Sequence, residues 1–198
     1  MTNNSEIKSL IVFDIDGTLT DSVVAHQQAF TKSLIELGVT KVDSNYAEHK
    51  HHTDSYIAKV IYEGFFSNKL TQELLKQFEE MICQKLNLQV INEIAGARDL
   101  ISRLELDSSF DYCFATGSLE KPAKYKLDCL NLDFHSDILV CSNDLNSRDD
   151  IVKTAIENSK VYYQQENYER IISIGDGLWD LKTANNLGIE FKGIGKKN

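Results

Sequence analysis

The sequence predicts an α/β protein in which a mainly parallel sheet lies between layers of helices and a helical domain is inserted after the first strand. Short apolar runs rich in β-branched and aromatic residues alternate with segments of helical period over most of the chain. One long stretch after the first run has helical period and no convincing strand. With 198 residues, 42% of them apolar, the chain is long enough to bury a core.

Five apolar runs are expected to form the strands of this sheet, at residues 10–13, 112–115, 138–141, 171–174 and 189–194. All but the last lack alternation of apolar and polar residues, which is typical of strands buried on both faces of a parallel sheet. Helical periods at residues 97–104, 151–156 and 178–187 would supply right-handed crossovers between them. The expected core therefore has three layers, α/β/α.

The stretch 20–92 is predicted to form a separate helical domain. Amphipathic helices are expected around residues 23–37, 57–61 and 70–86. Because this stretch follows the first strand, it would project from the carboxyl end of the sheet, where open α/β sheets have their binding sites. We therefore expect a core made of residues 1–19 and 93–198 and a cap made of residues 20–92.

Charge and hydropathy restrict the expected partners. There are 21 Lys and Arg residues against 30 Asp and Glu, and the net charge of −9 argues against binding along a nucleic acid. No apolar run approaches the roughly 20 residues that cross a bilayer, so a membrane is not expected either. No apolar seam of the coiled-coil type is visible, which favours a monomer.

Two features favour a cytoplasmic protein. Residues 1–8 lack the basic stretch and apolar run of a secretory signal. The cysteines are scattered without a close pair, so we expect reduced thiols rather than disulfides or a zinc site. They are Cys83, Cys113, Cys129 and Cys141.

Carboxylates cluster where two of the predicted strands end. Asp14 and Asp16 follow the first strand, and their spacing aims both side chains the same way. Asp176 and Asp180 follow the fourth strand. If these strands are neighbours, four carboxylates converge, and a hard divalent cation such as Mg²⁺ would relieve their repulsion. Taken singly, each Asp could instead cap a helix or form an Asx turn.

Another strand end carries Thr116, Gly117 and Ser118, whose hydroxyl and backbone N–H groups could hold phosphate oxygens. In this order, the segment 14–18, Thr116 and the segment 175–180 resemble three motifs of the haloacid dehalogenase superfamily of phosphohydrolases. The resemblance is to the group with a small helical cap, which includes phosphoglycolate phosphatases and β-phosphoglucomutases. It covers nearly the whole chain and implies a Rossmann-like core.

The same family has a further motif with a cation, usually Lys, between the second and fourth motifs. Arg148 stands at the expected place, at the start of a predicted helix near the sheet end. Lys153 and Lys160 are the alternatives, but both fall within or after that helix. Arg keeps the positive charge and replaces a compact ammonium by a broader fork.

The resemblance also implies a mechanism. Asp14 would attack phosphorus and form an aspartyl-phosphate, while Asp16 would act as general acid and then base, with a pKa raised by the neighbouring carboxylates. The implied phosphate-binding residues are Thr116, Gly117 and Arg148. The implied Mg²⁺ ligands are Asp14, Asp16 through its backbone carbonyl, Asp176 and Asp180. An acid at Asp16 favours phosphate-ester chemistry, because the dehalogenase and phosphonate-cleaving branches lack it.

Residues of the predicted cap are candidates for substrate contact. His26 shares a helical stripe with apolar residues, so a structural histidine and, by resemblance to β-phosphoglucomutase-like members, a substrate contact both fit. The locally basic segment comprises His49, Lys50, His51 and His52. It resembles in position the cap loop that selects substrates, while a solvated loop or a Zn²⁺ or Ni²⁺ site are the alternatives. Trp179 would pack against the sheet edge or wall the pocket.

The leading functional prediction is a Mg²⁺-dependent phosphatase acting on a small phosphorylated metabolite, such as a sugar phosphate or a phosphoglycolate-like acid. A sugar phosphomutase of the β-phosphoglucomutase type would use the same residues and would need a bisphosphate activator. A protein that binds a phosphometabolite without turnover is a third alternative, which the Arg at the third motif keeps open.

Overall fold

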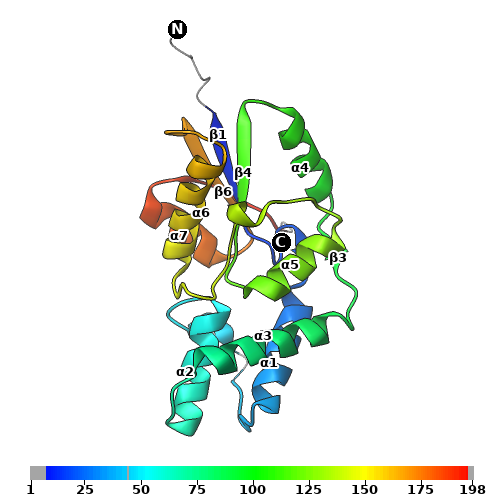
Figure 1. Cartoon of the computed structure of the whole chain (residues 1–198), viewed down its shortest axis with the longest axis vertical. Helices are drawn as coiled ribbons and strands as arrows, with labels where there is room; N and C mark the ends of the chain where they lie inside the picture. The colour runs from blue at the N-terminus through cyan, green and yellow to red at the C-terminus, as the bar shows by residue number, and fades with distance from the viewer. Residues whose placement is uncertain (1–7, 44, 196–198) are drawn as a thin grey trace.

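The computed structural model describes residues 8–43 and 45–195 and contains a five-stranded parallel sheet (Figure 1). Its strands are β1 (Ser9–Phe13), β4 (Phe110–Ala115), β5 (Leu139–Val140), β6 (Arg170–Gly175) and β7 (Glu190–Gly193). Their order in the sheet is β5-β4-β1-β6-β7, so β1 lies in the middle. Every residue of β1 is buried, as its apolar run predicts.

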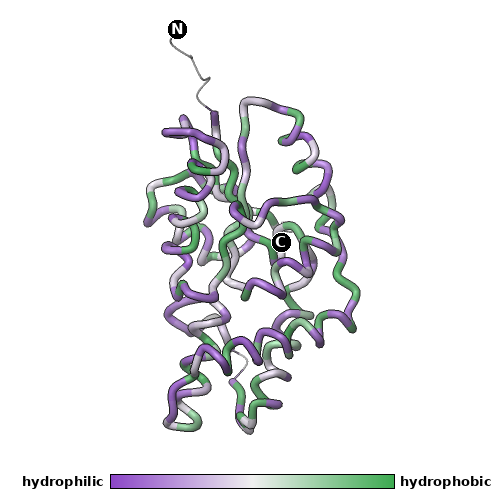
Figure 2. Tube along the Cα trace, viewed as in Figure 1, coloured by the Kyte–Doolittle hydropathy of each residue, from purple (hydrophilic) through white to green (hydrophobic). Residues whose placement is uncertain are grey.

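Helices cover both faces of this sheet. One face carries α4 (Ala97–Leu106) and α5 (Glu120–Cys129), and the other carries α6 (Arg148–Tyr162) and α7 (Leu178–Leu187) (Figure 1). Apolar strand segments run between these helical layers in the upper half of the molecule (Figure 2). A short 3₁₀ helix, η2 (Ser136–Ile138), precedes β5. Sheet and helices form the three-layer, Rossmann-like core that the sequence predicts.

Three helices form a separate unit at the carboxyl end of the sheet, here called the helical insert (Figure 1). They are α1 (Val23–Glu36), α2 (Asp54–Phe66) and α3 (Gln72–Leu86), with the 3₁₀ helix η1 (Tyr46–Glu48) between α1 and α2. A second buried apolar cluster lies mainly within the insert, where the rings of Phe30 and Phe78 meet edge to face at 5.0 Å between centroids. Leu119 of the α/β core also belongs to this cluster, so the insert packs against the core as well as on itself.

A pair of two-residue strands joins the insert to the core. β2 (Thr20–Asp21) and β3 (Asn92–Glu93) pair antiparallel where the chain leaves the core and where it returns. The sequence pattern predicted no strand in this stretch, and that prediction is wrong at its two ends. Two residues are too few to show an alternating pattern, and the pairing forms because the two ends of the insert lie side by side. The predicted domain boundaries coincide with this strand pair and stay a prediction.

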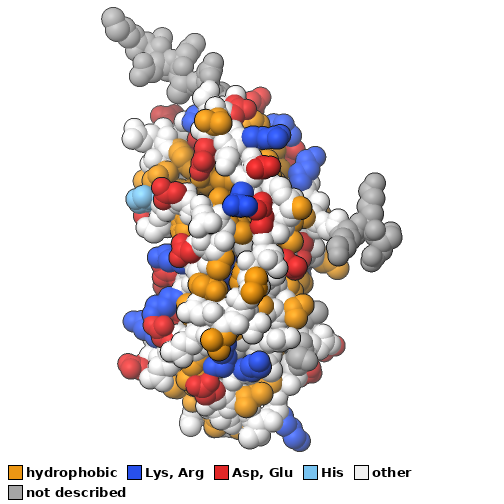
Figure 3. Space-filling model, turned by 90° about the vertical axis from the view of Figure 1, so that its right-hand side faces the viewer, with side chains coloured by type: hydrophobic (Ala, Val, Ile, Leu, Met, Phe, Trp, Pro, Cys, Tyr) orange, Lys and Arg blue, Asp and Glu red, His pale blue; other side chains and the backbone are white. Residues whose placement is uncertain are grey.

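The five predicted core strands are confirmed, with ends shifted by one or two residues. Within the described residues, no helix is long and apolar enough to cross a membrane. The four cysteines are free, and Cys113 is buried in the core. On the face drawn in Figure 3, charges of both signs are interspersed. The cytoplasmic prediction rests in part on residues 1–8, of which residues 1–7 lie outside the described part of the chain.

Candidate active site

The carboxyl ends of β1 and β6 bring three carboxylates together. The two strands are neighbours, with Phe13 opposite Ile174, and the Asp14 N–H donates to the Ile174 carbonyl at 2.9 Å. Carboxylate oxygens of Asp14, Asp176 and Asp180 lie within 4.8 Å of one another. These residues are called the three-acid cluster. The structure thus gathers three of the four acids that the sequence predicted to converge.

Gly17 makes room for this cluster. Its φ of +79° lies in the left-handed region that favours glycine. A Cβ atom at this position would collide with the carboxylate of Asp176. The Gly17 N–H donates to the Thr20 carbonyl at 2.8 Å, which fixes the turn after β1. A larger residue at position 17 would therefore displace one of the clustered acids.

The three-acid cluster lacks sufficient compensating charge. Burial raises the pKa of Asp14 to about 7, although Arg148 beside it opposes the rise. Burial and the neighbouring Asp14 raise the pKa of Asp176 to about 6, and burial raises that of Asp180 as well. The three carboxyl groups therefore resist being ionised at the same time. A divalent cation that prefers oxygen ligands, such as Mg²⁺, fits this set, because its charge would stabilise all three carboxylates.

Arg148 contacts this cluster from the start of α6. Its Nη1 donates to Asp14 Oδ1 at 2.9 Å and lies 3.6 Å from Asp180 Oδ1. Its Nε donates to the backbone carbonyl of His52 at 3.1 Å. Arg148 therefore links the acids of the core to a loop of the helical insert, at the place where the sequence predicted a cation.

The two alternative cations lie elsewhere on α6. Lys153 is exposed, and the Lys160 ammonium donates to Glu157 Oε1 at 3.0 Å on the helix surface. The helix begins at Arg148 because Ser147 caps it, with the Ser147 hydroxyl accepting from the Asp150 N–H at 3.1 Å. This start places Arg148 in the first turn, beside the carboxyl end of the sheet.

Asp16 is held by a different set of residues from the three-acid cluster. The Ser22 hydroxyl donates to its Oδ1 at 2.5 Å, and the Lys126 ammonium donates to its Oδ2 at 2.6 Å. Burial alone would raise the pKa of Asp16, but the Lys126 charge, with His26 and these hydrogen bonds, lowers it to about 2. The expected upward shift is therefore wrong, because it left out the ammonium.

Lys126 is a site residue that the sequence patterns did not predict. Its side chain is 0% exposed, and Nζ also donates to Ser118 Oγ at 3.1 Å. An ammonium buried to this extent is unfavourable unless it is paired, so Asp16 and Ser118 account for its position. Helical spacing offered a signal, because Lys126 lies three residues after the buried Ala123 of α5 and four residues before the buried Leu130, which caps the helix. A lysine on an apolar stripe indicates a buried partner.

The loop after β4 supplies polar groups to the site. Thr116 is buried, and its Oγ1 accepts from the Ser118 N–H at 3.1 Å. Gly117 and Ser118 line the cavity between the core and the insert, and Thr116 is not among its lining residues. A Cβ atom at Gly117 would press against the His52 carbonyl, so a glycine lets the insert approach this loop closely. The Gly117 carbonyl accepts a hydrogen bond from the Asp54 N–H at 2.8 Å.

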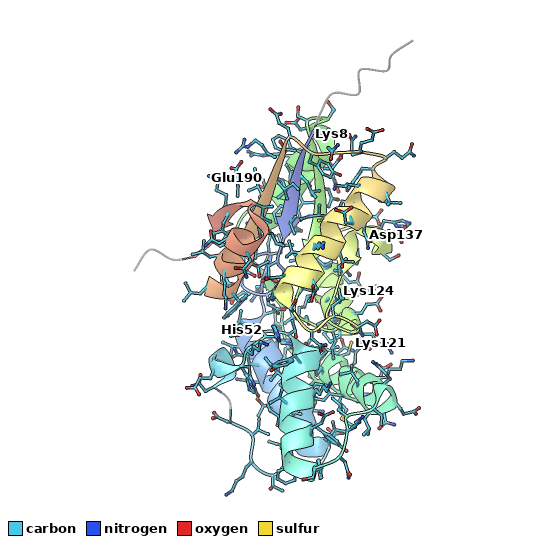
Figure 4. All side chains as sticks on the ribbon, turned by 90° about the vertical axis from the view of Figure 1, so that its left-hand side faces the viewer. Lys8, His52, Lys121, Lys124, Asp137 and Glu190 are labelled. Atoms are coloured by element: carbon cyan, nitrogen blue, oxygen red, sulfur yellow. The ribbon has the colours of Figure 1, made fainter. Side chains whose placement is uncertain are left out.

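A cavity of about 320 Å³ lies between the core and the helical insert. Its core side includes Asp14, Asp16 and Arg148, and its insert side includes His26 and His52. Figure 4 shows His52 at the junction of the two parts. The acids that follow β1 therefore face a compartment that the insert helps to enclose.

The N-terminus of α2 is hydrogen-bonded to the core. The Thr53 hydroxyl donates to the Asn146 carbonyl at 2.8 Å, and Asp54 Oδ2 accepts from the Leu119 N–H at 3.1 Å. His26 Nε2 lies 3.0 Å from both carboxylate oxygens of Asp54. His26 is buried, as its helical stripe predicted, and it also lines the cavity. Asp54 is a further polar group of the lining that the sequence patterns did not predict.

The basic segment divides between two places. His52 lines both the cavity and a neighbouring depression, whereas Lys50 and His51 line the depression alone. The His52 ring stacks on Trp179 with 4.9 Å between centroids and 25° between planes, so Trp179 walls the cavity. Burial and the charge of Arg148 lower the pKa of His52. His49 stacks on Tyr46 instead.

Comparisons with known proteins agree with this arrangement. A sequence model of the haloacid dehalogenase-like hydrolases matches residues 11–194. A hydrolase from Pseudomonas syringae is similar with a TM-score of 0.65 and 22% identity, covering 94% of this chain and 84% of that one. CbbY from Rhodobacter sphaeroides, in complex with phosphate, is similar with a TM-score of 0.67 and 18% identity, covering 93% and 84%. A putative β-phosphoglucomutase from Bacteroides vulgatus has a TM-score of 0.66 and 15% identity, covering 95% and 76%. None of the curated proteins compared matches this chain.

At these identities the structural likeness establishes the fold, and the sequence match establishes the family. That match runs from β1 to β7 and includes the helical insert and every strand end that carries a site residue. The motifs at those strand ends predicted the same assignment. The chain belongs to the haloacid dehalogenase-like hydrolase family.

Proposed function

We propose that the protein is a Mg²⁺-dependent phosphatase that hydrolyses a small phosphoric monoester through an intermediate on Asp14. The observation that carries this proposal is the contact between Arg148 and Asp14 at 2.9 Å, beside the other two acids of the three-acid cluster. Buried acids of like charge cost stability, so their gathering around one guanidinium is better explained by chemistry than by folding. The same gathering of acids argues against a protein that binds a phosphometabolite without turnover.

The three-acid cluster and the backbone carbonyl of Asp16 are the proposed Mg²⁺ ligands. The bound ion would neutralise charge on the transferring phosphoryl group and reduce its repulsion from the nucleophile. Asp14 would attack phosphorus as a carboxylate, oriented by the guanidinium of Arg148. Arg148 and the Gly117 N–H would then hold phosphoryl oxygens, with Thr116 supporting the loop.

Asp16 is the proposed acid and base. It would protonate the leaving oxygen in the first step and take a proton from the attacking water in the second. Ser22 and Lys126 both donate hydrogen bonds to its carboxylate and favour the ionised form. That form can accept a proton from water in the second step. For the first step, the negative charge of the bound phosphoryl group would have to raise the pKa of Asp16 so that it carries a proton.

We further propose that residues 20–92 act as a cap over this site. Thr53 joins α2 to the core, and the stack of His52 on Trp179 closes one side of the cavity. Exclusion of water would strengthen the electrostatic contacts inside. A cavity of about 320 Å³ suits a small metabolite, with His26 and His52 as the proposed substrate contacts.

Phosphate release tests this proposal. Purified protein is assayed with p-nitrophenyl phosphate and small phosphate esters, with and without Mg²⁺, beside the variant Asp14→Asn. Asp21→Asn is the matched control, because Asp21 is an exposed acid on β2. Release should need both Mg²⁺ and Asp14 and should survive in Asp21→Asn. Equal release from Asp14→Asn would contradict the proposed nucleophile.

A further inference from the structure

The two sides of the cavity differ in chemistry, and the leaving group must occupy the side formed by the insert. We propose that this leaving group is a small uncharged alcohol with an apolar body, and that the site disfavours esters carrying a second phosphate or a carboxylate. The inference rests on the proposed function and deepens it by naming the class of substrate.

The charges around the cavity leave no place for a second anionic group. Among the described residues that line the cavity, Arg148 is the only one with a Lys or Arg side chain. Its guanidinium already contacts Asp14 and Asp180. On the insert side, the carboxylate of Asp54 is buried and lines the cavity. A second phosphate or a carboxylate would face this negative charge without a cation of its own.

The insert also gives the cavity an apolar wall. Val23 and Phe30 from α1 and Ile57 from α2 line it. Phe30 is buried, and its ring is fixed edge to face against Tyr46 with 5.3 Å between centroids. Carbon atoms of a leaving group would bury against this wall, whereas a charged group would lose its hydration there.

The polar pair on the insert side is already engaged. His26 is buried, and its Nε2 lies 3.0 Å from both oxygens of Asp54. Its Nδ1 is buried as well, out of reach of a group in the cavity. This pair therefore offers no free donor to a second anionic group.

This chemistry also bears on the phosphomutase alternative. A mutase that takes a bisphosphate must bind the second phosphate while the first is transferred. On the insert side, a second phosphate would meet an apolar wall and a buried carboxylate that His26 already contacts, and it would find no Lys or Arg among the described lining residues. The inference therefore favours hydrolysis of a monophosphate over exchange with a bisphosphate.

Two pairs of substrates isolate the charge of the leaving group. Glycerol 1-phosphate is compared with 3-phosphoglycerate, and propane-1,3-diol monophosphate with its bisphosphate, while p-nitrophenyl phosphate reports the chemistry alone. We expect kcat/KM for each uncharged member to exceed that of its charged partner by about tenfold or more. The variant Gln27→Lys adds a cation to an exposed residue of α1 that lines the cavity. It should reduce both ratios.

Gln28→Lys is the matched control, because Gln28 is the next residue on α1, is equally exposed and lies outside the cavity lining. It should leave both ratios unchanged. Charged members that match their uncharged partners, while p-nitrophenyl phosphate is hydrolysed, would overturn the substrate class and leave the proposed function standing. Unchanged ratios in Gln27→Lys would overturn the charge argument. Absence of Asp14-dependent hydrolysis of every ester would overturn the proposed function and this inference together.

Discussion

Replacing Lys126 with Met removes the ammonium that holds Asp16 and keeps most of the volume of the buried side chain. In the structure Nζ lies 2.6 Å from Asp16 Oδ2 and 3.1 Å from Ser118 Oγ, and the Lys126 side chain is 0% exposed. In the variant, the Asp16 carboxylate stays buried. Of its two side-chain hydrogen-bond donors, Lys126 and Ser22, it keeps the Ser22 hydroxyl. We therefore expect a loss of stability that depends on the ionisation of Asp16.

The size of the loss follows from the shift of the Asp16 pKa. That pKa falls from 3.8 to about 2 in the folded protein. A shift of this size corresponds to roughly 2 to 3 kcal/mol at neutral pH, and removing one partner of a buried ion pair typically costs about 3 to 5 kcal/mol. We expect Lys126→Met to lower the free energy of unfolding by about 3 kcal/mol at pH 7.

The sign of the pH dependence is fixed by the direction of the shift. Because the folded-state pKa of Asp16 lies below its usual value, the stabilisation is present above the ordinary pKa of 3.8 and is lost as the pH falls through about 2. In Lys126→Met, burial without the ammonium raises the folded-state pKa of Asp16 above its ordinary value. The difference between wild type and Lys126→Met should therefore be largest at neutral pH, begin to shrink as the pH falls through that raised pKa, and go on shrinking toward pH 2.

Urea unfolding with EDTA present, at pH 7, 5 and 3, measures this difference without a contribution from bound metal. Lys124→Met is the matched control on the same helix (Figure 4). Its ammonium is 39% exposed and pairs with Glu120 at the surface, so its loss should cost less than about 1 kcal/mol. Equal destabilisation by the two variants, or a Lys126→Met effect that does not change toward pH 3, would refute the reasoning.

Three further outcomes are expected from the site. Arg148→Ala should lower kcat by about 10²-fold or more because it removes the guanidinium from the nucleophile, whereas Lys153→Ala on the exposed face of α6 should leave kcat nearly unchanged in the same phosphate-release assay. His52→Ala should change the emission of Trp179, the one tryptophan of the chain, because the ring stacked on it is removed; an unchanged spectrum would contradict the stack. Asp176→Asn should raise the Mg²⁺ concentration needed for half-maximal activity, and an unaltered requirement would remove Asp176 from the proposed ligands.

Sequence patterns could place residues whose positions follow from the ends of strands and helices. Asp14 and Asp176 meet because β1 and β6 are adjacent parallel strands, and apolar runs were enough to predict both strands. Arg148 could be chosen over Lys153 because only the first turn of α6 lies beside the sheet end. These predictions needed no knowledge of how helices pack.

Residues whose positions depend on packing between elements could not be placed in this way. Lys126 reaches Asp16 because α5 packs against the loop after β1, and its charge reversed the expected direction of the Asp16 pKa shift. Asp54 and His52 face the cavity because the start of α2 is hydrogen-bonded to the core. Helical period can show which face is buried, but it does not name the neighbour.

The covalent intermediate on Asp14 is the central claim, and mass spectrometry of a trapped protein tests it most directly. The variant Asp16→Ala, incubated with Mg²⁺ and p-nitrophenyl phosphate, keeps the nucleophile and lacks the base that would activate water, while the aryl leaving group needs little protonation. The protein should accumulate one phosphoryl group, which peptide mapping should place on Asp14. Phosphate released at the wild-type rate with no adduct on Asp14, or an adduct that persists when Asp14 is also changed to Asn, would contradict the account.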